Sequence, residues 1–296
     1  MKAEETALRT IVEVPKRTNP MQKTHRFVLL GSCFAQYMGE RFQKEGMDAV
    51  CNPLGAAYNP ASIRIQVRIA LESEELRVKS EEYDLQLGSV SNSNSSLSTL
   101  HSSLFTLHSS LFQYDGKWRC WWANTLLSDT DERRFRQTIQ DTFSRLGEAL
   151  RNADFLFITL GTNVCYRLKE NGMIVTNCHK VPDRNFEEVT LDTEACTQTL
   201  HGLMELLAKE CPRLHVVFTV SPYRYRKYGF HGSQLAKAAL LLAVDKICKR
   251  FPEKASYFPA YEIMLDELRD YSFYADDMIH PAPAAVDHIW NRLWNK

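Results

Sequence analysis

Two adjacent residues near the N-terminus, Ser32 and Cys33, could attack an acyl group. They follow Gly31, which comes after a short apolar run at 27–30, and they precede a helical pattern that starts near Phe34. Glycine permits the sharp turn that a nucleophile needs, and a side chain at a helix start feels the positive end of the helix dipole. This position favours a thiolate or an alkoxide-like oxygen. The alternative is a tight turn with a capping serine and a buried cysteine.

Asp277 and His280, near the C-terminus, have the spacing of a general base and the carboxylate that orients it. A carboxylate three residues before a histidine can accept a hydrogen bond from one ring nitrogen, which leaves the other nitrogen free as a base. Pro281 keeps the segment before it from continuing as a helix. Many Asp-x-x-His pairs are surface ion pairs, but this pair follows the last predicted strand, where a site is expected.

Three residues could stabilise a developing oxyanion. Gly161 and Asn163 follow the apolar run at 155–160, and Gly55 ends the segment after a short run at 49–51. A glycine N–H and an asparagine amide at a strand end are suitable donors. The alternative for all three is ordinary turn chemistry, in which glycine and asparagine are common.

Two further polar groups could bind an anionic part of a substrate. His179 lies in the polar stretch 177–180, for which a solvated loop is the alternative. Arg224 and Arg226 follow the apolar run at 215–220 and could hold a carboxylate or a phosphate.

Short apolar runs alternate with helical patterns along the chain. The predicted strands are the runs at 27–30, 49–51, 155–160 and 215–220. The predicted helices carry apolar stripes that start at Phe34 and Phe135, and we expect Ser233 to cap a third. This order predicts an α/β fold, a three-layer α/β/α sandwich around a central parallel sheet, in a single domain over 1–296.

A serine-rich segment at about 89–112 interrupts this order. It contains a near repeat of LHSSLFT as LHSSLFQ, which places His101 and His108 seven residues apart. We interpret the segment as a surface insertion, and the histidine spacing as a product of the duplication and not as a metal site. It lacks the spacing of an amphipathic helix, so we expect it to be dispensable for folding.

Composition excludes several classes of partner. Thirty-six basic residues balance thirty-six acidic ones, which gives no bulk charge to attract nucleic acid or a membrane. The N-terminal sequence has no apolar core of a signal peptide, and the apolar runs are too short to span a bilayer. We therefore expect a cytoplasmic location. The eight cysteines fit no zinc template, so we expect no metal and no cofactor.

Taken together, these motifs resemble the GSCFA family, within the SGNH/GDSL hydrolase superfamily. Residues 31–35 spell the family's name, and the resemblance continues through 52–55, 58–60, 160–162, 177–182, 221–224, 258–262 and 277–281. It implies a flavodoxin-like sandwich with a nucleophile turn, an oxyanion glycine, a Gly-x-Asn motif and a C-terminal Asp-x-x-His. By register it puts Cys33 at the nucleophile position, one residue after Ser32. It also makes Asn59 a substrate-binding candidate, whereas the segment 121–124 lacks the histidine expected there.

The leading interpretation is an esterase or acyl hydrolase that forms an acyl-enzyme at Cys33 or Ser32 and acts on a small-molecule or carbohydrate ester. An O-acyltransferase would use the same residues, with a hydroxyl group in place of water. A non-catalytic carbohydrate- or ligand-binding domain is the alternative from another class. If Cys33 attacks, the helix start and His280 should lower the pKa of its thiol.

Overall fold

A five-stranded parallel sheet forms the centre of the molecule. The structure is a computed structural model, and it describes residues 10–15, 19–83 and 106–294. The strands of the sheet are β1 (Arg26–Gly31), β2 (Asp48–Cys51), β5 (Phe155–Leu160), β9 (His215–Val220) and β10 (Ala255–Tyr257). They lie in the order β10-β9-β5-β1-β2, and every pair is parallel. Counted along the chain, this is the flavodoxin-like order 2-1-3-4-5, as expected.

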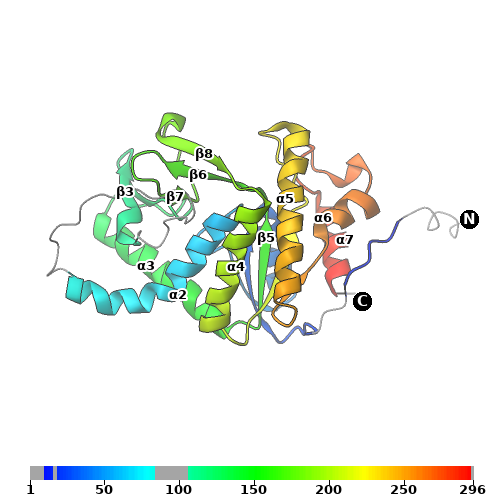
Figure 1. The fold of residues 1–296 in the computed structure, drawn as a ribbon, viewed down its shortest axis with the longest axis horizontal. Coiled ribbons are helices and arrows are strands. Elements are labelled where there is room, and N and C mark those ends of the chain that lie inside the picture. The colour runs from blue at the N-terminus through cyan, green and yellow to red at the C-terminus, as the bar shows by residue number, and fades with distance from the viewer. Residues whose placement is uncertain (1–9, 16–18, 84–105, 295–296) are drawn as a thin grey trace, which may run out of the picture.

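Alternate residues of the central strands enter two separate cores. Phe27 and Leu29 of β1 pack on one face, whereas Val28 and Leu30 pack on the other. The first face is covered by α1 (Cys33–Lys44) and α7 (Pro283–Trp294). The second is covered by α2 (Pro60–Tyr83), α3 (Glu132–Asn152), α4 (Thr193–Glu210) and α5 (Gly229–Arg250), of which α4 and α5 lie side by side in front of β5 (Figure 1). The predicted three-layer sandwich is therefore confirmed.

The helices α1 and α5 differ in how well the sequence predicts their first residues. Ser32 caps α1, and Phe34, Met38 and Phe42 form its buried face, as their spacing predicts. The expected cap of α5 is wrong: the helix begins at Gly229, and Ser233 lies buried inside its first turns. The helix α5 therefore begins one turn nearer the N-terminus than the sequence indicated.

Two small antiparallel sheets accompany the main sheet. One pairs β3 (Leu111–Tyr114) with β4 (Lys117–Cys120), and the other has the order β7-β6-β8. The strands of the second are β6 (Val164–Leu168), β7 (Ile174–Val175) and β8 (Phe186–Thr190). Because β6 begins four residues after β5 ends, this sheet continues from the carboxyl edge of the main sheet (Figure 1).

Short helical turns complete the described chain. They are η3 (His108–Ser110), η4 (Asp183–Asn185), α6 (Ala260–Glu262), η5 (Ile263–Glu267) and η6 (Tyr271–Phe273). None of the helices in the described part of the chain is long and apolar enough to cross a membrane. The same residues contain no group of three or more potential metal-ligating side chains.

The described end of the serine-rich segment is part of the packed structure. Ser110 is fully buried against Cys120, and the Phe112 ring stacks on Trp121 with centroids 3.6 Å apart. Residues 106–112 therefore belong to the packed structure, because the second copy of the repeat supplies η3 and most of β3. Residues 89–105 and His101 lie outside the described residues.

Gly31 closes β1 against β5 in a backbone conformation that side chains rarely adopt. Its φ is +139°, and a Cβ atom added there would lie 2.2 Å from the carbonyl oxygen of Thr159. The next N–H, that of Ser32, donates to this same carbonyl at 3.0 Å. Only glycine lets the chain pass this point and turn directly into α1.

A deletion series should separate the insertion from the fold. Removal of 89–105 is expected to leave the melting temperature within about 3 °C, because the sequence predicts a surface insertion there and such insertions tolerate changes in length. Removal of 89–112 should lower it by roughly 10 °C, because it also strips Phe112 from Trp121. Differential scanning fluorimetry of both variants checks this, and equal melting temperatures for the two would contradict it.

Gly31→Ala is expected to cost about 3 kcal/mol of unfolding free energy or more, because the new Cβ meets backbone and not a movable side chain. The matched control is Gly172→Ala, at a φ of +78° with no atom within 4 Å of the added Cβ, which should cost about 1 kcal/mol. Urea unfolding measures both. Equal costs would show that the contact with Thr159 relaxes easily.

Candidate active site

The carboxyl ends of β1, β5 and β9 meet at the point where the strand order reverses. Between β1 and β5 the chain connections leave the sheet in opposite directions, and ligands bind outside such a switch point in doubly wound sheets. Cys33 follows β1 by two residues and Gly161 follows β5 directly. The expected nucleophile turn and the expected Gly-x-Asn motif are therefore brought together.

Ser32 has a structural role in this turn. Its side chain is completely buried, and its Oγ accepts a hydrogen bond from the N–H of Phe34 at 3.3 Å. Gly161 lies next to Ser32, since a Cβ added to that glycine would be in van der Waals contact with the Ser32 Cβ at 3.5 Å. This is the N-cap that the alternative interpretation described for the serine.

Cys33 is the first residue of α1 and is only partly buried. Burial raises the pKa of its thiol, while the N–H groups of Phe34 and Cys33 and the ammonium of Lys237 lower it. The expected net lowering of the Cys33 pKa is therefore wrong, because desolvation outweighs the helix start. In the free protein the group is held mainly as a thiol, and it needs a base to become a nucleophile.

Asp277 and His280 form the expected pair. The Nδ1 of His280 lies 2.6 Å from Oδ2 of Asp277, and Oδ1 accepts from the N–H groups of Ile279 and His280. The backbone N–H and then the ring of His280 lower the pKa of Asp277 to about 2, so this carboxylate is ionised throughout the neutral range. An ionised Asp277 holds the proton of His280 on Nδ1 and leaves Nε2 as the basic atom.

Arg224 holds the segment that carries this pair. Its N–H donates to the carbonyl of Ile279 at 3.0 Å, and its guanidinium donates to that of Met278 at 3.1 Å. The guanidinium also lies over the rings of Phe230 and Tyr274, at 4.1 and 5.1 Å. The residue expected to bind an anion thus supports the backbone at a strained position and at the residue after it, since Met278 has a φ of +56°.

Tyr223 lies between the two halves of the site. Its ring centroid is 4.6 Å from that of His280, and the charges of both Cys33 and Asp277 raise its pKa in addition to burial. Asp277 also acts on Cys33 electrostatically. Among the described residues, the sulfur of Cys33 and the His280 ring form no direct hydrogen bond, an arrangement common in sites without substrate.

The expected oxyanion donors are partly used by the fold. The N–H of Gly161 donates to the carbonyl of Tyr58 at 2.7 Å, and that of Gly55 donates to the carbonyl of Asn52 at 2.7 Å. Both N–H groups therefore already have backbone acceptors, and neither is a free donor in this structure. Asn163 donates one N–H of its side-chain amide to the carbonyl of Leu191 at 2.6 Å, and the second N–H of that amide remains as a possible donor.

Two other predicted residues are structural. Asn59 accepts the N–H of Ser62 at 2.8 Å and so caps α2. His179 is 1% exposed, its Nε2 donates to the carbonyl of Cys120 at 2.8 Å, and Nδ1 lies 3.1 Å from Oγ1 of Thr125. Burial lowers its pKa to about 4, so its ring is neutral near pH 7 and has no charge with which to bind an anion.

The sequence analysis missed two polar residues at this edge. The Oδ1 of Asn52 accepts the N–H of Gly31 at 2.9 Å, and its buried Nδ2 has no partner in the described structure, so it is a spare donor beside the turn. Lys237 of α5 is 1% exposed, and its Nζ donates to the carbonyls of Gly161 and Ser221. Lys237 lies three residues before Leu240 on the apolar stripe of its helix, and a lysine there was the available signal.

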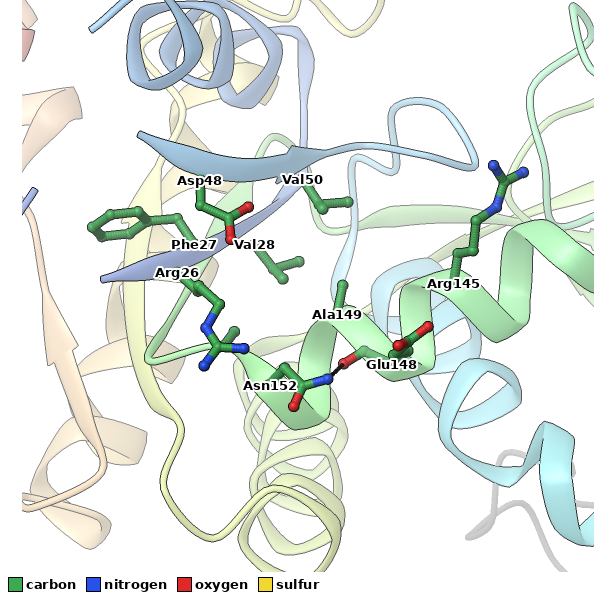
Figure 2. Close-up of a pocket in the computed structure, with 10 residues that line it drawn as sticks. Arg26, Phe27, Val28, Asp48, Val50, Arg145, Glu148, Ala149 and Asn152 are labelled. Atoms are coloured by element: carbon green, nitrogen blue, oxygen red, sulfur yellow. Dashed lines mark hydrogen bonds between the residues drawn. The ribbon is translucent and has the colours of Figure 1, made fainter. Parts of the chain in front are cut away.

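A shallow cavity of about 250 Å³ lies at the opposite end of the sheet (Figure 2). Arg26 and Asp48, the first residues of β1 and β2, line it together with Arg145, Glu148 and Asn152 of α3. None of the predicted site residues borders it. The cavity is therefore separate from the candidate active site.

Comparison with protein families agrees with the motifs found in the sequence. The model of the GSCFA family matches residues 26–293. No curated protein matches the chain. Among solved structures, the chain is similar to an acetyl xylan esterase (Est2A) from the rumen bacterium Butyrivibrio proteoclasticus, with 14% identity and a TM-score of 0.30. That match covers 48% of this chain and only 36% of the other, which is too distant to carry an argument. The family match, in contrast, runs from the first residue of β1 into α7, and the chain belongs to the GSCFA family.

Proposed function

We propose that this protein is an acyl hydrolase of the SGNH type that acts on esters through Cys33, with His280 as the general base. The observation that carries the proposal is the position of Cys33. It is the partly exposed first residue of a helix at the switch point of the sheet, within electrostatic reach of an Asp277–His280 pair. Ser32, which is buried and caps the helix, is the weaker candidate for the attacking group.

The proposed reaction has two steps. The Nε2 atom of His280 takes the thiol proton as the sulfur of Cys33 attacks the ester carbonyl, and the alcohol leaves with that proton. Water then attacks the acyl thioester, gives its proton to His280, and releases the acid and the free thiol. Asp277 stabilises the imidazolium that forms in each step. The second N–H of Asn163 is the side-chain donor that we propose for the oxyanion.

Aromatic residues support a substrate with a ring, such as an acylated sugar. Besides burial, the charge of a Cys33 thiolate raises the pKa values of Tyr37, Tyr58 and Tyr223, which supports their being near the proposed nucleophile. Tyr37 and Tyr58 are 36% and 38% exposed. Tyrosine offers an apolar face and a hydroxyl, which suits a sugar ring. A hydroxyl acceptor in place of water would turn the same chemistry into acyl transfer.

All eight cysteines are free thiols, which supports a reducing compartment such as the cytoplasm.

Substitution of the two candidate nucleophiles tests the proposal. Cys33→Ala should abolish turnover of acylated sugars and aryl esters and should prevent formation of an acyl-enzyme seen by mass spectrometry. Ser32→Ala should keep most of the activity and lose about 1 kcal/mol of stability, because it removes only a helix cap. The matched control is Cys248→Ala, a half-buried cysteine of α5. A fully active Cys33→Ala variant would refute the thiol mechanism.

His280→Ala should lower kcat/KM by about 10²–10⁴ without loss of the fold, because it removes the only proposed base. His201→Ala provides the control, since that histidine pairs with Glu205 on α4, away from the switch point. Circular dichroism verifies folding of both variants. Near-normal turnover by folded His280→Ala protein would exclude this residue as the base.

A further inference from the structure

Lys237 is a buried cation that the proposed mechanism does not use. Its side chain is 1% exposed, and its ammonium donates to the carbonyl of Gly161 at 2.7 Å and to that of Ser221 at 2.8 Å. These two residues directly follow β5 and β9. The ammonium is also 5.8 Å from the centre of the Tyr261 ring. It therefore lies beneath the carboxyl edge of the sheet.

This position is next to the nucleophile turn. Gly161, one of its two acceptors, packs directly against Ser32. The charges of Lys237 and Cys33 act on each other in both directions. We propose that Lys237 is a positioning residue for Cys33, and that its ammonium stabilises the thiolate form from beneath the turn. The catalytic meaning of this role rests on the proposed function, but the stabilisation itself does not require turnover.

A purely mechanical role does not account for a lysine here. A neutral side chain, such as glutamine, could also donate to backbone carbonyls at the ends of β5 and β9. Burying an ammonium without a carboxylate partner costs several kcal/mol, and two carbonyls and a ring offset only part of that. Burial accordingly lowers the pKa of Lys237 to about 7. The group that favours the protonated form of Lys237 is Cys33, when its sulfur carries a negative charge.

The other ionisable groups around the pair make this cation necessary. Asp277 raises the pKa of Cys33, as does burial. The groups that face the pair besides Asp277 are the phenols of Tyr37, Tyr58, Tyr223 and Tyr261. None of these supplies a positive charge, and the other ionisable group nearby is the His280 ring, which lies beside Tyr223. Besides the backbone N–H groups of Phe34 and Cys33, Lys237 is the group that acts on the thiol in the direction opposite to Asp277.

Coupling between the two groups predicts a specific pH profile for Cys33. Below about pH 7 the ammonium is present, and thiolate increases tenfold per pH unit. Above this pH the two groups have together lost one proton, and they exist either as thiol and amine or as thiolate and ammonium. The ratio of these two forms does not depend on pH, so the thiolate fraction stays level. It increases again only when the thiol ionises beside a neutral amine. The result is a shoulder of about one to two pH units.

The test is the rate of iodoacetamide alkylation of Cys33 from about pH 6 to pH 10, followed by peptide mass spectrometry. Wild type should show the shoulder. Lys237→Met, which keeps the length of the side chain, should lose it and react about tenfold more slowly below pH 7, with the two rates merging above about pH 9. Lys237→Arg should restore the faster reaction. Lys249→Met on the same helix is the control, since Lys249 is exposed and pairs with Asp245.

His280 needs its own control, because an imidazolium could also produce a shoulder. The profile is therefore repeated in His280→Ala protein, where a shoulder due to Lys237 persists and one due to His280 disappears. This measurement uses no variant of Lys237, so it remains decisive if Lys237→Met does not fold. A profile in His280→Ala protein without a shoulder, or an unchanged profile in folded Lys237→Met, overturns the proposal. Failure of the esterase assay with an intact shoulder would instead refute the proposed function alone.

Discussion

The close approach of β1 to β5 is the constraint on which the site depends. Gly31 touches the backbone of Thr159 so closely that no side chain fits between them, and the next N–H bonds to the same carbonyl. This contact fixes where the chain leaves the sheet, and α1 begins within two residues. The direction of the first helical turn then decides which side chain is buried and which one faces outward. The position of Cys33 at the start of α1 is thus a consequence of backbone packing between two strands.

Much of the fold could be predicted because its strands are buried on both sides. Continuous apolar runs placed β5 and β9 at their observed bounds, and the order of strands and helices predicted the parallel sheet. The small sheets were not predicted, because β7 has only two residues and β8 has two adjacent exposed glutamates and few apolar positions. Such short antiparallel strands are stabilised by contacts with distant segments and leave no periodic signal.

The candidate site was predicted in outline and missed in detail. The Asp277–His280 pair depends on a local spacing, which sequence reveals directly. The choice between Ser32 and Cys33 depends on which residue caps α1, a difference of one position that spacing does not resolve. The N–H groups of Gly55 and Gly161 seemed available because the carbonyls that accept them lie in other segments of the chain. Lys237 was overlooked because lysines in helices are usually solvated, although its position on the apolar stripe set it apart.

The manner in which Arg224 holds the Asp277–His280 segment has a consequence for heat inactivation. Arg224 secures this segment at two carbonyls, and the bridge of Tyr274 to Pro281 is its nearest sheet-like contact. Such a segment can open by itself at a smaller free energy than the strands, whose opening exposes both cores. On gradual heating the Asp277–His280 pair would therefore leave its place while the sheet is still intact. Any activity that depends on this pair would then be lost before the cooperative transition, and the loss would be reversible on cooling.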